Sequence, residues 1–137
     1  MDARKAAPKT AKDAATAPEP TLLVVDDEWV ITAAIADYFR ELGFAVLQAR
    51  SADGAIQHLE RTRVDVVVSD ISMPGGMSGI ELAKWILRER PAVVIVLMSG
   101  RSIKGDVARE LGAAVPFFAK PFDLDRLERC IHERLAA

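Results

Sequence analysis

At the ends of short apolar runs, this chain has five polar residues of the types that bind a cation or a phosphoryl group. They are Asp26, Asp27, Asp70, Ser99 and Lys120. The clearest case is Asp70, which ends a β-branched run and precedes a segment rich in glycine and proline, so a buried strand meets a loop there. Ligands of open α/β sheets bind at the carboxyl ends of parallel strands. The sequence therefore predicts that these five side chains converge at one edge.

The chemistry of this set points to phosphoryl transfer. Two carboxylates about 5 Å apart repel by roughly 3 kcal/mol at an effective dielectric of about 20, so either one protonates or a cation binds. Hard oxygen ligands of this kind suit Mg²⁺. Lys120 can pair with a phosphate oxygen, and Ser99 can donate a hydrogen bond. A carboxylate in such a site can act as the nucleophile and form an aspartyl phosphate.

Five strands alternating with five helices are needed to position these residues. Helix caps and apolar spacing place the helices between the strands, with Ser51, Ser78 or Gly79, and Asp123 at helix starts. The strands are predicted at Thr21–Val25, Phe44–Gln48, Val64–Ser69, Ala92–Met98 and Val115–Ala119. The helices are predicted from Trp29 to Leu42, from Ser51 to Arg61, from Ser78 or Gly79 to Arg90, from Ile103 to Leu111, and from Asp123 to Leu135. This alternation indicates an α/β fold, a parallel sheet with helices on both faces.

Apolar side chains predict which faces of the helices are buried. For the first helix we expect an apolar face of Trp29, Val30, Ala33, Ala34, Ala36, Tyr38, Phe39 and Leu42. For the third helix we expect burial of Ile80, Leu82, Ala83, Ile86 and Leu87. Cys130 is expected to pack in the last helix as a small apolar residue. We expect His58 and His132 to be surface residues, away from the acidic edge.

Composition limits the class of protein. The chain has 137 residues, of which 50% are apolar and 28% charged, as expected for one globular domain. Its net charge of −2 argues against direct nucleic-acid binding. One cysteine, no membrane-length apolar run and no signal peptide predict a cytoplasmic protein without membrane insertion. Residues 1–20 lack large apolar residues apart from Met1, which predicts a flexible tail; a docking arm or linker is the alternative.

In this order and on these elements, the motifs resemble the receiver domain of bacterial two-component response regulators. The resemblance covers about Thr21 to Leu135. It depends on Asp26-Asp27, the run from Asp70 to Pro74, Ser99-Gly100 and the run from Lys120 to Phe122. It implies a flavodoxin-like (βα)5 fold with strand order 2-1-3-4-5, and a receiver domain over residues 21–137 of the stand-alone type.

The resemblance also implies a role for each matching residue. Asp70 would accept a phosphoryl group from a sensor histidine kinase or a phosphotransfer protein. Asp27, Asp70 and the backbone carbonyl of Ser72 would bind Mg²⁺, and Asp26 would act largely through water. Lys120 would contact the phosphoryl group. Ser99 would be the switch hydroxyl, Phe117 the switch aromatic, and the Lys120–Pro121 peptide bond would be cis. Partner binding would change through the surface of the last two helices and the last strand, for a downstream protein that is not identified.

One departure from the family pattern concerns the loop after Asp70. The family usually has a glycine eight residues after the phosphoacceptor, whereas Gly79 here comes nine residues after Asp70. We interpret this as one residue inserted near Gly75 and Gly76. Ser72 and Arg101, each two residues beyond a site residue, are candidates for controlling water access to the phosphoryl group.

Other readings of the same residues stay open. The Asp26-Asp27-Glu28 run alone could be a solvated helix start, since acids favour helix N-termini. Ser99 alone could be a helix cap, and Phe117 could be a fixed core residue. At the level of function, the alternatives to a signalling receiver are a Mg²⁺-dependent phosphatase of small molecules and a phosphorylation-independent interaction module. We expect a receiver that assists its own phosphoryl transfer rather than a multi-substrate enzyme.

Overall fold

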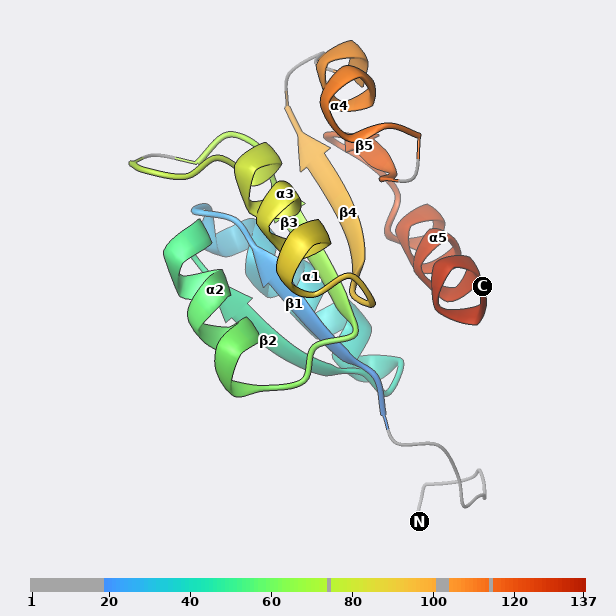
Figure 1. Ribbon diagram of the computed structural model, residues 1–137. Coiled ribbons are helices and arrows are strands. Elements are labelled where there is room, and N and C mark those ends of the chain that lie inside the picture. The colour runs from blue at the N-terminus through green and yellow to red at the C-terminus, as the bar shows by residue number, and fades with distance from the viewer. Residues whose placement is uncertain (1–18, 74, 101–103, 114) are drawn as a thin grey trace.

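The sheet has five parallel strands in the order β2-β1-β3-β4-β5, as predicted (Figure 1). The computed structural model describes residues 19–73, 75–100, 104–113 and 115–137. The strands are β1 (Thr21–Val25), β2 (Ala45–Ala49), β3 (Val66–Asp70), β4 (Val94–Ser99) and β5 (Phe117–Ala119). The helices are α1 (Trp29–Glu41), α2 (Ala52–Arg61), α3 (Gly79–Glu89), α4 (Lys104–Leu111) and α5 (Leu124–Ala136). Within the described ranges, no helix reaches the length and apolar character needed to cross a membrane.

Two apolar layers sandwich the sheet. On one face α1 and α5 pack on alternate strand residues such as Leu22, Val24 and Val68, and on the other face α2, α3 and α4 pack on Leu23 and Val67 (Figure 1). Every residue of β3 is buried, as expected for a central strand covered on both faces. Consecutive side chains of a strand point to opposite faces, so an uninterrupted apolar run serves both layers.

Two helix starts carry the caps that the sequence predicts, and a third does not. The Ser51 hydroxyl accepts a hydrogen bond from the Gly54 N–H, and Ser78 forms a capping box with Glu81. Asp123 occupies the N-cap position of α5, but none of the described N–H groups of that helix donates to its side chain. The predicted cap is therefore wrong in its hydrogen bond and right in its position.

Strand ends differ from the prediction by one or two residues because the parallel register decides them. Asp70 and Ser99 are the last paired residues of β3 and β4, rather than the residues after them. At the edge of the sheet, β5 begins at Phe117 and pairs three residues with β4.

Four large apolar residues of α1, its C-cap and α3 are exposed rather than buried as predicted, namely Trp29, Val30, Leu42 and Leu87. Ala34 is exposed as well. The buried stripe of α1 runs through Thr32, Ile35, Ala36 and Phe39, and that of α3 through Gly79, Leu82, Ala83 and Ile86. Each stripe follows the i, i+3, i+4, i+7 spacing that faces one neighbouring surface. The exposed residues lie off these stripes or at the helix ends.

Candidate functional site

Three carboxylates meet at the carboxyl edge of the sheet. Asp26 and Asp27 follow β1, and Asp70 ends β3, whose register pairs Ser69 with Val25. One carboxylate oxygen from each of the three aspartates lies within 4.8 Å of the others. Asp26 and Asp70 are buried, whereas Asp27 is half-buried. The predicted convergence of these residues is thus present, and the oxygen donor set fits a hard divalent cation.

Lys120 reaches this cluster from the end of β5, the edge strand that β3 and β4 separate from β1. Its ammonium nitrogen lies 2.8 Å from Asp26 Oδ2 and 3.4 Å from Asp70 Oδ1. The Lys120 N–H donates to the Ser99 carbonyl oxygen over 2.8 Å, which extends the pairing of β4 with β5 and fixes the base of the side chain. Only 16% of the Lys120 side chain is exposed. A nearly buried ammonium therefore bridges two buried carboxylates.

Burial and charge shift the pKa of two groups in this cluster. Burial raises the pKa of the Asp70 carboxyl above its ordinary value, and the Asp26 and Asp27 carboxylates raise it further, while Lys120 opposes them. Burial lowers the pKa of Lys120, but the hydrogen bond and charge of Asp26 and the charge of Asp70 outweigh burial, so its pKa is raised overall. One ammonium does not neutralise the acidic cluster, which therefore favours an added cation.

The other predicted site residues lie around this cluster in different settings. Ser99 is buried at the end of β4, opposite Ala119 of β5. Ser72 is exposed in the loop that follows β3. Phe117 begins β5 and is half-buried against the layer that contains α3 and α4. The Lys120–Pro121 peptide bond is cis.

The loop between β3 and α3 includes Gly75 and Gly76, where the sequence predicts an inserted residue. Gly75 and Gly76 have φ angles of +68° and +76°, the left-handed region that glycine adopts without strain. Gly79 starts α3 directly against the end of β3: a Cβ at position 79 would lie 2.2 Å from the Asp70 carbonyl oxygen and 2.6 Å from Ile71 Cα. Gly79 therefore permits this close approach of α3 to the end of β3.

Several named residues take no described part in the site. Arg101 and Pro74 lie outside the described residues, as do residues 1–18 and Ile103.

His58 is half-buried rather than on the surface, with Nε2 3.2 Å from the Gln48 carbonyl oxygen. His132 is exposed on α5, where Nε2 lies 3.5 Å from Glu128 Oε2. Cys130 is half-buried and packs against the apolar layer of α1 and α5, as predicted.

Glu28 is a neighbour of the site that the sequence did not single out. Its backbone N–H donates to Asp26 Oδ1 over 2.9 Å, and its Oε1 lies 3.7 Å from Lys120 Nζ. The residue was visible in the sequence as the third acid of the Asp26-Asp27-Glu28 run. A helix-start interpretation accounts equally well for an acid there, so the sequence offered no signal of its contact with Lys120.

Comparison with known proteins identifies the fold and its class. Residues 22–132 match the family described as "Response regulator receiver domain". The chain belongs to this family. It is 32% identical over 116 residues to the sporulation initiation phosphotransferase F of Bacillus subtilis, covering 83% of this chain and 92% of that protein. It is 37% identical over 108 residues to the nitrogen assimilation regulatory protein NtrX of Azorhizobium caulinodans, covering 77% of this chain but only 24% of that protein.

Solved receiver structures share the architecture. A response regulator receiver protein from Sinorhizobium medicae superposes with a TM-score of 0.81 at 26% identity, covering 87% of this chain and 96% of that chain. The response regulator TrrA of Thermotoga maritima, crystallised in complex with Mg²⁺ and beryllofluoride, gives a TM-score of 0.73 at 27% identity, covering 84% of this chain and 98% of that chain. The receiver fold therefore accounts for the described chain from β1 to α5.

Proposed function

We propose that Asp70 accepts a phosphoryl group from a phosphohistidine of a sensor histidine kinase or a phosphotransfer protein. The observation that carries this proposal is the bridge that Lys120 forms between Asp26 and Asp70 inside a cluster of three carboxylates. The family supports it, because receiver domains take phosphoryl groups from such donors. Asp70 is the carboxylate placed at the end of the central strand, next to both a cation-binding cluster and an ammonium.

The proposed transfer is an in-line displacement. A carboxylate oxygen of Asp70 forms a bond to phosphorus while the phosphorus–nitrogen bond of the phosphohistidine breaks, and the electron pair of that bond goes to the imidazole nitrogen. Lys120 neutralises charge on the phosphoryl oxygens, as a fixed ammonium in a water-poor site does effectively. Burial raises the pKa of Asp70, whereas a nearby positive charge such as Lys120 lowers it. Positive charge therefore favours the ionised, nucleophilic form of the carboxyl.

Mg²⁺ is the cation proposed for the acidic cluster. Asp26, Asp27 and Asp70 would hold it, together with the backbone carbonyl of Ser72, and it would neutralise charge shared by the carboxylates and the phosphoryl group. The related TrrA of Thermotoga maritima binds Mg²⁺ together with a phosphoryl mimic in its crystal structure, which supports the same ligand here. We further propose that the domain processes only its own phosphoryl group and does not turn over free phosphate monoesters.

Intact-mass analysis after incubation with Mg²⁺ and acetyl phosphate tests the acceptor. The wild-type protein should gain one phosphoryl group, and Asp70→Asn should gain none. Asp53→Asn is the matched control, because Asp53 is an exposed acid in the first turn of α2. A phosphoryl adduct that persists in Asp70→Asn would show that another residue is the acceptor.

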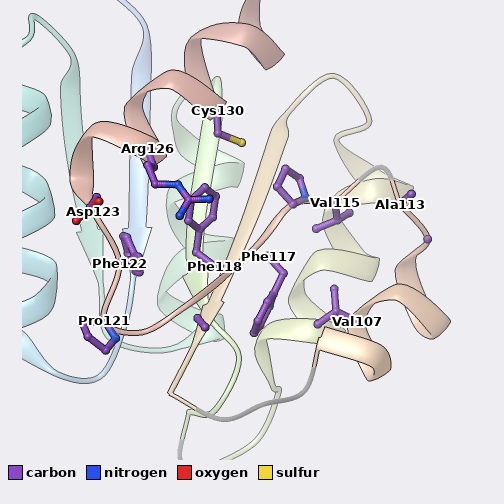
Figure 2. A pocket seen from close by; sticks show the side chains of 13 residues that line it. Val107, Ala113, Val115, Phe117, Phe118, Pro121, Phe122, Asp123, Arg126 and Cys130 are labelled. Carbon is purple, nitrogen blue, oxygen red and sulfur yellow. The ribbon is translucent and has the colours of Figure 1, made fainter.

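We propose that phosphorylation is transmitted through Ser99 and Phe117 to the surface formed by α4, β5 and α5. A groove of about 670 Å³ lies on this surface. Figure 2 shows Phe117 on the α4 side of the groove, near Val107, and Phe118 on the α5 side, near Arg126. A shift of Ser99 toward the phosphoryl oxygens would make room for Phe117 to turn inward, which would reshape the groove for a downstream protein.

A further inference from the structure

Among the described residues, Lys120 has three acidic neighbours, and the most distant of them is not part of the aspartate cluster. The ammonium nitrogen lies 2.8 Å from Asp26, 3.4 Å from Asp70 and 3.7 Å from Glu28. The two aspartates are nearly fully buried, but the Glu28 side chain is 64% exposed at the mouth of the site. An incoming phosphoryl group needs the same ammonium. Glu28 is therefore placed to compete for it from the solvent side.

The local structure argues against a purely structural role for this glutamate. Glu28 occupies the N-cap position of α1, where a short polar side chain would accept a backbone hydrogen bond. None of the described N–H groups of α1 donates to the Glu28 side chain, although the Glu28 carbonyl accepts from Ile31 and Thr32. The carboxylate faces Lys120 instead. Its backbone N–H also holds Asp26 Oδ1, which fixes where the side chain begins.

We propose that Glu28 is a positioning residue that tunes phosphorylation of Asp70 through Lys120, an inference that rests on the proposed function. Its carboxylate competes with Asp70 for the Lys120 ammonium and adds a negative charge at the site. From the two distances to Lys120, Glu28 Oε1 lies within about 7 Å of Asp70 Oδ1. A charge at that distance favours a bound cation and opposes a bound anion.

Removal of this charge should therefore change cation and anion binding in opposite directions. In Glu28→Gln, Mg²⁺ affinity should fall by about threefold, since one attractive charge is lost through a screened medium. At saturating Mg²⁺, beryllofluoride affinity and the rate of phosphorylation by acetyl phosphate should rise by about threefold. In that reaction an Asp70 oxygen bonds to phosphorus, and acetate leaves with the electron pair of the broken phosphorus–oxygen bond. A variant that merely loosened α1 would weaken both ligands together.

The experiment measures Mg²⁺ and beryllofluoride affinity by calorimetry and the phosphorylation rate by intact mass, at low and at high salt. Glu41→Gln is the matched control, because it removes the same charge at the other end of α1, about 20 Å along the helix axis. The opposite shifts should appear in Glu28→Gln, shrink at high salt and be absent in Glu41→Gln. Glu28→Asp keeps the charge and should be close to the wild type. Wild-type values in Glu28→Gln, or equal shifts in Glu41→Gln, would overturn the role of Glu28. Failure of the wild-type protein to phosphorylate would overturn the proposed function instead.

Discussion

Replacement of Asp70 by asparagine should stabilise the fold against unfolding when no divalent cation is present. At an effective dielectric of about 20, a carboxylate pair within 4.8 Å repels by at least about 3.5 kcal/mol, and Asp70 has two such neighbours in Asp26 and Asp27. Lys120, at 3.4 Å, attracts the Asp70 carboxylate by about 5 kcal/mol. The balance is a net repulsion of about 2 kcal/mol, to which burial of the charge adds. Asp70→Asn removes this penalty and keeps the shape of the side chain.

Urea unfolding in EDTA, followed by circular dichroism, measures the effect as an increase of about 2 kcal/mol in the free energy of unfolding. Mg²⁺ should reverse the order of the two proteins, because a ligand at a hundred times its Kd adds about 2.7 kcal/mol to the wild type. Asp70→Asn would lack one of the proposed Mg²⁺ ligands and should gain less stability from the cation. The cluster of three carboxylates thus predicts a crossover between the two stabilities as Mg²⁺ is added.

The stability difference between the wild type and Asp70→Asn should depend on pH with a definite sign. The pKa of Asp70 is raised in the folded state, so the folded protein binds its proton more readily than the unfolded chain. The penalty in the wild type is therefore fully present above the raised pKa and disappears as pH falls toward the unfolded value of 3.8. The stability difference between wild type and Asp70→Asn should vanish at low pH.

Asp65→Asn provides the control of opposite sign. The Asp65 carboxylate accepts from the Thr21 N–H over 2.8 Å and lies 3.6 Å from Arg63, so the substitution weakens a hydrogen bond and an ion pair. This variant should lose stability at neutral pH, by about 1 kcal/mol. If Asp70→Asn were also less stable than the wild type in EDTA, the electrostatic account of the site would be refuted.

Three further predictions concern the cation, the loop and the switch. In a Trp85→Phe background, Mg²⁺ should change the fluorescence of Trp29 saturably, because Trp29 begins α1 two residues after the acidic pair. Gly79→Ala should cost about 3 kcal/mol in urea unfolding, since a Cβ there would overlap backbone atoms of β3. Ser99→Ala should still be phosphorylated, but beryllofluoride should then change amide hydrogen exchange across residues 104–125 much less than in the wild type.

Each of these has an outcome that contradicts it. Calorimetry and fluorescence that both show no Mg²⁺ binding would argue against a cation in the acidic cluster. Gly100→Ala is the control for Gly79→Ala, because a Cβ at position 100 would meet no described atom within 4 Å; equal losses would remove the steric argument. A full exchange response in Ser99→Ala would leave Ser99 without a switching role.

Sequence alone was sufficient for the fold and for most of the site, and the reason is topological. Apolar runs that alternate with amphipathic segments predict a parallel sheet, and a parallel sheet places all carboxyl ends of its strands at one edge. Asp26, Asp70 and Lys120 end up together for that reason, although Lys120 is 94 residues from Asp26. The apolar runs of the central strands were equally predictable, because strands covered on both faces bury consecutive apolar side chains, as Val66, Val67 and Val68 of β3 do.

The tertiary structure alone decided the features that depend on distances between separate elements. Burial of an apolar residue depends on whether a neighbouring element covers its position, so Trp29 and Val30 are 58% and 79% exposed although the helix around them is apolar. The exact ends of β5 depend on its register with β4, which local sequence does not contain. Glu28 became part of the site only because Lys120, from the far end of the chain, lies 3.7 Å from its carboxylate. Charge interactions of this kind act across space and are invisible in local sequence.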